Sequence, residues 1–255
     1  MQIVVRGRGP ALVMLHGWAM HGGVFAALAA RLEQHFTLHL VDLPGHGRSA
    51  DSDIALELDV VARHIAARTP PALWLGWSLG GLVALQAGQR YPASVRGLMM
   101  ICASPRFVRA GDWPQGMDAN VFRDFADELA RDYRATIDRF LMLEAYGSDH
   151  AREEIRLLRE QVFVHGQPSR QRLGEGLALL QDTDLRAGLP ALSMPSLWIA
   201  GRRDRLVSPQ AMQAAAALAA DGEYLCIEHG GHAPFLTHGD AVAEAILQFS
   251  EALPA

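Results

Sequence analysis

The sequence predicts an α/β fold in which a mostly parallel central sheet is flanked by helices and carries an inserted helical cap. Short, fully apolar runs alternate with helical stretches in the first third of the chain and again in the last quarter. Such runs are typical of strands that are covered on both faces, and the alternation is typical of a parallel sheet. From about 107 to 189 only helical patterns occur. The helical segment is therefore expected to interrupt one sheet.

The expected elements can be given in chain order. The first part of the core, residues 1–105, has expected strands at 11–15, 36–41, 72–76 and 95–102 and expected helices at 24–32, 54–67 and 79–90. The cap, residues 106–190, has expected helices at 120–129, 133–145, 151–164 and 170–180. The second part of the core, residues 191–255, has expected strands at 196–200 and 223–227 and expected helices at 209–218 and 240–252. An insertion at one sheet edge is a natural lid over a site.

Composition excludes several classes of function. The chain has 255 residues, of which 50% are hydrophobic, so it can bury a large core and is not a disordered protein. No apolar stretch is long enough to span a membrane, and the N-terminus lacks the layout of a signal peptide, so we expect a cytoplasmic protein. A net charge of -5 argues against nucleic acid as a partner. All 23 residues counted as lysine or arginine are arginine, which excludes lysine Schiff-base chemistry.

The two cysteines, Cys102 and Cys226, lie in apolar, strand-like runs. In a cytoplasmic protein we expect both to be buried, reduced thiols.

A candidate nucleophile lies between an expected strand and an expected helix. Residues 76–80 read Gly-Trp-Ser-Leu-Gly and fit the pattern G-x-S-x-G, in which a tight turn exposes the central serine at the carboxyl end of a sheet. The helix that follows adds partial positive charge for a developing oxyanion. Ser78 is therefore the expected nucleophile.

A serine hydroxyl needs a base, and the base needs a carboxylate that orients it. Asp204 follows the expected strand 196–200, and His232 follows the expected strand 223–227, in the order Ser, Asp, His that this architecture uses. Two glycines precede His232 and permit a tight loop, so we favour it over its neighbours His229 and His238. The rival acids, Asp182 and Asp184, are typical of helix ends.

The oxyanion hole is expected to use two backbone N–H groups. One belongs to Leu79, directly after the nucleophile, and the other to Trp18, in the turn after the strand 11–15. The Trp18 ring is expected to pack in the core and to wall the pocket. The remaining histidines, such as His35 and His39, form no ligand cluster, so we expect neither a metal nor a cofactor.

Five sequence features together resemble the α/β-hydrolase superfamily. They are Leu-His-Gly-Trp at 15–18, Asp-Leu-Pro-Gly-His-Gly-Arg-Ser at 42–49, the serine motif at 76–80, Asp204, and Gly-His at 231–232. A closer resemblance is to the biotin-synthesis carboxylesterases, which demethylate the methyl ester of pimeloyl-acyl-carrier protein. It is carried by residues 36–45, 74–83, 112–114, 139–141, 182–186 and 232–235.

This resemblance implies cleavage of an ester on a carrier-bound acyl chain. It implies substrate contacts from Trp18, Ser78, Leu79 and His232. It also implies an acyl channel lined by the cap residues Phe140, Leu141, Met142, Leu143 and Glu144. Glu144 stands where the family pattern has an uncharged glutamine.

The resemblance further implies that arginines of the cap grip the acidic carrier protein. They fall on Arg139, Arg152 and Arg156, and Ala135 stands where a further arginine is expected, beside Arg134. Positions 152, 156 and 159 also form one stripe on a helix, which adds Arg159 to this group. Ile155, Leu158 and Val162 form a second, apolar stripe that is expected to face the core. The alternative is a solvated face that is balanced by Glu153 and Glu160.

Other functions stay open on the same residues. A general short-chain carboxylesterase, or a carbon–carbon bond hydrolase or lyase, would use the same serine, histidine and aspartate. A non-catalytic binding protein of this fold is disfavoured because all three residues are present in order. Dehalogenases and epoxide hydrolases are disfavoured because they carry aspartate at the position of Ser78. We expect the chain to be a monomer.

Overall fold

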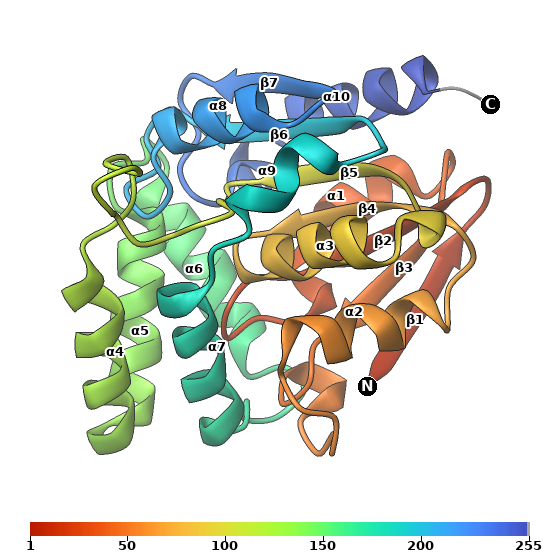
Figure 1. Ribbon diagram of the computed structural model, residues 1–255. Helices are drawn as coiled ribbons and strands as arrows, with labels where there is room; N and C mark the ends of the chain where they lie inside the picture. Colours follow the sequence, from red (N-terminus) through yellow and green to blue (C-terminus); the bar gives the residue numbers. More distant parts are fainter. Residues whose placement is uncertain (254–255) are drawn as a thin grey trace.

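A seven-stranded sheet forms the centre of the computed structural model, which describes residues 1–253 (Figure 1). Its strands are β1 (Gln2–Gly7), β2 (Ala11–Leu15), β3 (Thr37–Asp42), β4 (Ala72–Trp77), β5 (Val95–Ile101), β6 (Ser196–Gly201) and β7 (Gly222–Ile227). They lie in the order β1-β3-β2-β4-β5-β6-β7, and every neighbouring pair is parallel except β1 with β3. The expected mostly parallel sheet is confirmed, with each expected strand within a residue of its observed limits.

Strand β1 was not among the expected strands. It pairs antiparallel with β3, from Gln2 opposite Asp42 to Gly7 opposite Thr37, and forms one edge of the sheet. All of its residues are exposed or half-buried, unlike those of β4 and β6, which are fully buried. The alternation of strands and helices predicts only parallel strands. It therefore does not predict an antiparallel strand such as β1, which precedes the alternation.

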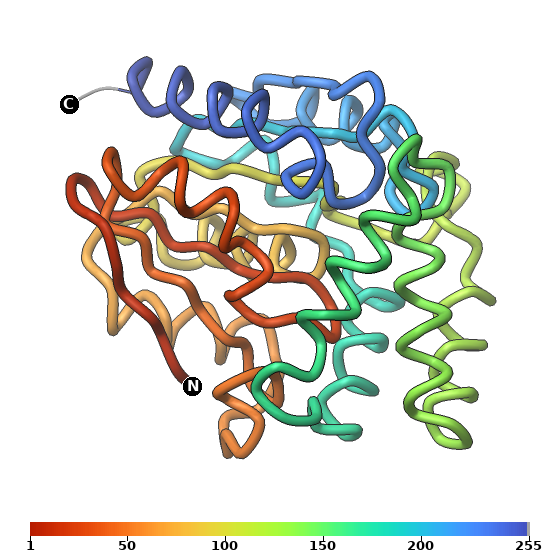
Figure 2. The backbone as a smooth tube through the Cα atoms, turned by 180° about the vertical axis from the view of Figure 1, so that it is seen from behind, coloured from red at the N-terminus to blue at the C-terminus, as the bar shows by residue number. Residues whose placement is uncertain are grey.

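Helices cover both faces of the sheet. Those of the core are α1 (Ala26–Leu32), α2 (Leu58–Ala66), α3 (Leu79–Arg90), α8 (Pro209–Leu218), α9 (Pro234–Thr237) and α10 (Gly239–Ala252). The shorter 3-10 turns are η1 (Gly22–Phe25), η2 (Gly47–Ser49), η3 (Pro92–Ser94) and η4 (Arg186–Ala191). Helices α2, α3 and α8 lie on one face, and α1 and α10 lie on the other (Figures 1 and 2). Helix α3 is buried along most of its length, which makes it the centre of the core.

Four further helices stand between β5 and β6 in the chain, and we call them the cap. They are α4 (Ala119–Arg131), α5 (Tyr133–Ala145), α6 (Ala151–Val162) and α7 (Arg170–Asp182). Asp118, Asp132 and Ser169 begin α4, α5 and α7 by accepting hydrogen bonds from N–H groups of the first turn. The cap helices stand together at one end of the sheet (Figure 1).

Two expectations about the whole chain can be compared with the structure. No helix in the described part of the chain combines the length and the apolar character needed to cross a membrane. Both cysteines are free, and Cys102 is buried as expected. The expectation was wrong for Cys226, which is only partly buried because β7 is an edge strand of the sheet.

Candidate active site

Ser78 occupies a strained turn between β4 and α3. Its backbone has φ 53° and ψ -119°, a conformation that costs a non-glycine residue about 1–3 kcal/mol. The flanking glycines let the strand and the helix approach each other. A Cβ on Gly76 would lie 2.5 Å from the carbonyl oxygen of Gly80, and a Cβ on Gly80 would lie 2.3 Å from that of Leu15. The G-x-S-x-G pattern therefore has the backbone geometry that its motif requires.

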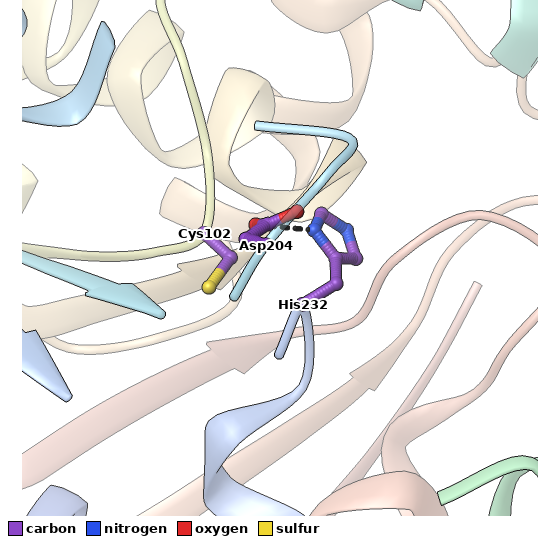
Figure 3. Close-up of side chains that lie close together, drawn as sticks. All are labelled: Cys102, Asp204 and His232. Atoms are coloured by element: carbon purple, nitrogen blue, oxygen red, sulfur yellow. Dashed lines mark hydrogen bonds and ion pairs between the residues drawn. The ribbon is translucent and has the colours of Figure 1, made fainter. Parts of the chain in front are cut away.

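Asp204 and His232 are brought together from two different loops, after β6 and β7. Nδ1 of His232 lies 2.8 Å from Oδ2 of Asp204 (Figure 3). The other carboxylate oxygen accepts N–H bonds from Leu206 at 2.8 Å and Val207 at 2.9 Å. The carboxylate is thus fixed at both oxygens. Because Nδ1 donates to it, the Nε2 atom of a neutral His232 carries the free lone pair.

The charge of Asp204 also sets the protonation of His232. Burial on its own would lower the pKa of His232, but the negative charge of Asp204, the hydrogen bond to it and the smaller effects of Glu144 and Glu154 together outweigh burial and raise that pKa. A base with a raised pKa accepts a proton more readily, as a general base must.

Ser78 and His232 leave their reactive atoms unpaired. Both residues are buried, and neither Oγ of Ser78 nor Nε2 of His232 has a hydrogen-bond partner among the described residues. Trp77, directly before the serine, joins the turn of Ser78 to the loop of His232. Its indole N–H donates to the carbonyl oxygen of His232 at 2.8 Å. Catalytic hydrogen bonds often shorten only when substrate is bound, so two free reactive atoms are compatible with a nucleophile and its base.

The turn after β2 lies directly against the serine. A Cβ on Gly17 would lie 3.2 Å from Cβ of Ser78 and 3.0 Å from the Trp77 ring, so a larger residue would have to push these neighbours aside by a few tenths of an ångström. Leu79 is the first residue of α3, and its N–H therefore has no partner within the helix. Trp18 is fully buried, and its indole N–H donates to the carbonyl oxygen of Leu173 in α7 at 2.8 Å. The backbone N–H of Trp18 stays the expected second donor of the oxyanion hole.

His16 holds this turn in place, a role that the sequence did not reveal. Its Nδ1–H donates to the carbonyl oxygen of Gly17 at 2.7 Å, and its Nε2 accepts the N–H of Leu43 at 2.9 Å. Nε2 can accept a hydrogen bond only while the imidazole is neutral. Burial lowers the pKa of His16 to about 3, which keeps the ring neutral.

The five residues expected to line the acyl channel do not all lie on the buried face of helix α5. Phe140, Leu141 and Glu144 are buried, and the Phe140 ring lies 4.5 Å from that of Trp18, between centroids. Leu143 is half-buried. Met142 is 48% exposed and lines a surface depression with Arg139, so the structure does not bring it together with the others. The helical period explains the division, because position 142 points away from the face shared by 140, 141 and 144.

Glu144 is buried beside His232. Oε1 of Glu144 lies 4.0 Å from Nε2 of His232, and neither of its oxygens has a hydrogen-bond partner among the described residues. Burial raises the pKa of Glu144 to about 8. At neutral pH the side chain is therefore mainly a neutral acid, and as such it is closer to the glutamine of the family pattern than its charge suggests.

This burial makes a prediction for stability. The folded pKa of Glu144 lies far above the ordinary value of 4.5, so the unfolded chain ionises first and the wild-type protein loses stability between about pH 4.5 and 8. The loss is about 1.4 kcal/mol per pH unit at most. Glutamine cannot ionise, so Glu144→Gln is expected to raise the Tm relative to wild type more at pH 8 than at pH 5. Equal Tm differences at both pH values would contradict this; thermal unfolding followed by circular dichroism measures them.

Two further buried groups near His232 were missed. Glu154 of α6 accepts hydrogen bonds from Ser148 at 2.7 Å and Thr237 at 3.2 Å, and its second oxygen would lie 3.0 Å from a Cβ on Gly231. Helical spacing had placed 155, 158 and 162 on the inner face; Leu158 and Val162 are buried and Ile155 is half-buried. A glutamate next to this apolar stripe is expected to be exposed to solvent. Nothing in the sequence therefore indicates that Glu154 is buried.

Cys102 is the other missed group. Its Sγ lies 3.6 Å from the carbonyl oxygen of Gly231, to which the thiol donates, and its ligand atom lies within 4.8 Å of those of Asp204 and His232 (Figure 3). Three such groups can hold a metal, but a metal binds the thiolate. Burial raises the pKa of the Cys102 thiol well above its ordinary value, and Asp204 already holds Nδ1 of His232. Cys102 therefore supports the loop of His232 through its hydrogen bond to Gly231. That this group of residues holds no metal stays our prediction.

The four arginines expected to bind a carrier are exposed on α5 and α6. Three have acidic partners within the cap: Arg139 with Glu128, Arg156 with Glu160 at 2.7 Å, and Arg159 with Asp138 at 2.8 Å. Arg152 has no ion-pair partner among the described residues. Exposed pairs contribute little, so a partner protein can replace them. The pair of Arg156 with Glu160 is also what the solvated-face alternative expects, and carrier binding stays a prediction.

Comparisons with known proteins identify the family of this chain. Residues 10–239 match the α/β-hydrolase fold family. The chain is 60% identical to the pimeloyl-(acyl-carrier protein) methyl ester esterase of Stenotrophomonas maltophilia (strain R551-3), over 98% of this chain and 96% of that protein. It is 57% identical to the esterase of the same name from Xanthomonas oryzae pv. oryzae (strain MAFF 311018), over 100% of both.

A solved structure, the bromoperoxidase from Bacillus anthracis, has a TM-score of 0.88 at 19% identity and covers 98% of this chain and 94% of its own, which shows the fold alone. The relatives at 57% and 60% identity, by contrast, span the cap as well as the core. The chain therefore belongs to the α/β-hydrolase fold family and, within it, to the family of the pimeloyl-(acyl-carrier protein) methyl ester esterases.

Proposed function

We propose that this chain is a serine carboxylesterase that hydrolyses the methyl ester of pimeloyl-acyl-carrier protein, in biotin synthesis, to pimeloyl-acyl-carrier protein and methanol. The observation that carries the proposal is 60% identity over 98% of the chain to a relative named for this reaction. In the proposal, residues 106–190 form the lid over a core made of 1–105 and 191–255. The protein acts as a cytoplasmic monomer without cofactor or metal.

The first half of the reaction forms an acyl-enzyme. Nε2 of His232, oriented by Asp204, takes the proton of Ser78 as Oγ attacks the ester carbonyl carbon. The N–H groups of Leu79 and Trp18 stabilise the oxyanion; loss of one such donor typically costs about 100- to 1000-fold in rate. The tetrahedral intermediate then collapses, the bond to the methoxy oxygen breaks, and His232 returns its proton to that oxygen, so that methanol leaves.

The second half releases the acid. Water gives a proton to Nε2 of His232 and attacks the acyl carbon, and a second tetrahedral intermediate forms in the same oxyanion hole. Its collapse breaks the bond to Oγ of Ser78, which regains a proton from His232. The product is a carboxylate whose other end is still attached to the carrier.

The test compares a carrier-bound substrate with a free one. The purified protein is incubated with methyl pimeloyl-acyl-carrier protein and, separately, with a short p-nitrophenyl ester, and the demethylated carrier is measured by mass spectrometry. We expect kcat/KM to be higher for the carrier-bound ester. Equal or higher kcat/KM for the short ester would instead indicate a general short-chain carboxylesterase, and cleavage of a vinylogous diketone would indicate a carbon–carbon bond hydrolase.

A genetic test addresses the place of the reaction in the cell. The gene is expected to restore biotin-independent growth to a cell that lacks its demethylating esterase. Failure to restore growth, with the protein expressed and folded, would count against the proposed substrate.

The exposed arginines of α6 carry a prediction of their own. Arg152→Glu combined with Arg156→Glu is expected to raise KM for the carrier-bound ester about tenfold, because two favourable surface charges of up to about 1 kcal/mol each become unfavourable. The KM of a p-nitrophenyl ester should not change. Arg90→Glu, at the exposed end of α3, is the matched control. An unchanged KM for the carrier-bound ester in the double variant would rule these arginines out, and the salt dependence of KM gives a second check.

A further inference from the structure

The imidazole of His232 has a carboxyl group at each of its two nitrogen atoms. Asp204 lies 2.8 Å from Nδ1, whereas Oε1 of Glu144, from the cap, lies 4.0 Å from Nε2. Nε2 is the atom that has to exchange a proton with Ser78 and with the leaving group. Glu144 is therefore placed at the working side of the base, and Asp204 at its supporting side.

Glu144 is buried without any partner that satisfies its carboxyl group in the described part of the chain. It is 1% exposed, and both of its oxygens are without a hydrogen-bond partner among the described residues. A buried carboxylate without hydrogen bonds is very unfavourable, so the group is kept neutral or is paired with a cation. The nearest group able to become a cation is the imidazole of His232.

The groups that act on Glu144 come from three elements. They are His232 in the loop after β7, Asp204 in the loop after β6, and Glu154 in α6. Burial has the largest effect on the pKa of Glu144 and raises it to about 8; His232 lowers it, and the two acids raise it further. No arginine is among these groups, and among the described residues the ion-pair partner of Glu144 is His232, so a proton on His232 can balance a negative charge on Glu144.

We propose that Glu144 is a proton-dependent positioning residue for His232, active when neutral and inhibitory when ionised. As a neutral acid it leaves the lone pair of Nε2 to Ser78. As a carboxylate it needs to approach by only about 1 Å to form a charge-assisted hydrogen bond with the protonated Nε2. That bond withholds the proton that has to pass from Nε2 to the oxygen of the leaving alcohol. The inference rests on the proposed ester hydrolysis, but not on the identity of the acyl chain or the carrier.

The test is the pH dependence of kcat for the wild-type protein and for Glu144→Gln, with an uncharged short-chain methyl ester as substrate, because its leaving methoxy oxygen has to take a proton from Nε2. Glutamine has nearly the shape of the neutral acid and cannot ionise. We expect the wild-type kcat to fall above about pH 8, by up to about tenfold per pH unit, as one proton is lost. The variant should lack this fall, so that its kcat relative to its own value at pH 7 stays level above about pH 8. Glu153→Gln, at an exposed position of α6, is the control and should keep the wild-type profile.

A second measurement does not depend on turnover. Nuclear magnetic resonance of 15N-labelled histidine follows the protonation of His232 directly. The charge of Glu144 acts to raise the pKa of His232, so Glu144→Gln is expected to lower it. An alkaline fall of kcat that persists in the variant, or a titration of His232 that is the same in both proteins, would overturn the proposal. If wild type hydrolyses no ester at all while the titration does shift, the proposed function fails and the coupling of the two groups stands.

Discussion

Alanine in place of Ser78 is expected to lower kcat for esters by about a million-fold while the protein folds and melts as before. The change removes the attacking oxygen, and no other hydroxyl lies at the turn between β4 and α3. Oγ of Ser78 has no hydrogen-bond partner among the described residues, so its loss leaves no group unpaired. Alanine carries a Cβ as serine does, so the strain at φ 53° is the same in both proteins.

Three measurements check this result. They are turnover of a short p-nitrophenyl ester, covalent labelling by a fluorophosphonate, and the Tm. Ser94→Ala, in the half-buried turn η3, is the matched control and should keep all three at wild-type values. Near-wild-type turnover by the Ser78 variant would falsify the assignment of the nucleophile, and a wild-type protein that resists labelling would indicate a non-catalytic binding protein.

The substitution Asp204→Asn is expected to lower kcat about ten-thousand-fold, although the two side chains have nearly the same shape. One oxygen of Asp204 accepts the N–H groups of Leu206 and Val207, so the amide oxygen of the variant has to take that place. The NH2 group then faces Nδ1 of His232 and donates to it. The imidazole has to carry its proton on Nε2 instead, and in that tautomer it cannot take the proton of Ser78.

The same geometry predicts that this variant folds normally, because both backbone N–H groups keep their acceptor. The kcat and the Tm are measured side by side, with Asp182→Asn as the control. Asp182 is one of the two alternative acids in the sequence, and among the described residues its side chain accepts a hydrogen bond from its neighbour Gln181, far from His232 in sequence. An unchanged kcat in the Asp204 variant would contradict the assignment of Asp204 as the acid that orients His232. A large loss of kcat in the Asp182 variant would assign that role to Asp182 instead.

Much of the fold could be predicted because the central strands are short, mostly apolar runs bounded by polar turns. Strand β4 and helix α3 were expected within one residue of their observed limits. The carboxyl ends of parallel strands lie together, so the expected parallel sheet also predicts that Asp204 and His232, which follow two such strands, lie close to each other. Strand β1 was not predicted, because this edge strand is only partly buried, is not a wholly apolar run and follows no helix.

The inward-facing acids of the cap could not be predicted. Periodicity assigns burial to apolar residues and solvent to charged ones, so Glu144 and Glu154 read as surface positions from spacing alone. What buries them is the packing of α5 and α6 against the loop of His232, which joins parts of the chain far apart in sequence. For Glu144 the family resemblance supplied the missing signal, because it placed the residue in the acyl channel. It placed Met142 there as well, although the rotation of α5 turns that side chain outward.

Trp18 links the turn after β2, in the core, to helix α7 of the cap. Its indole N–H is bonded to the carbonyl oxygen of Leu173, and a Cβ on Gly176 of the same helix would lie 2.9 Å from its ring. Helix α7 therefore cannot lift without releasing the residue whose backbone is expected to bind the oxyanion. An acyl chain that orders the cap and an oxyanion that orders the Trp18 turn thus stabilise the same arrangement, and linkage requires each to strengthen the binding of the other.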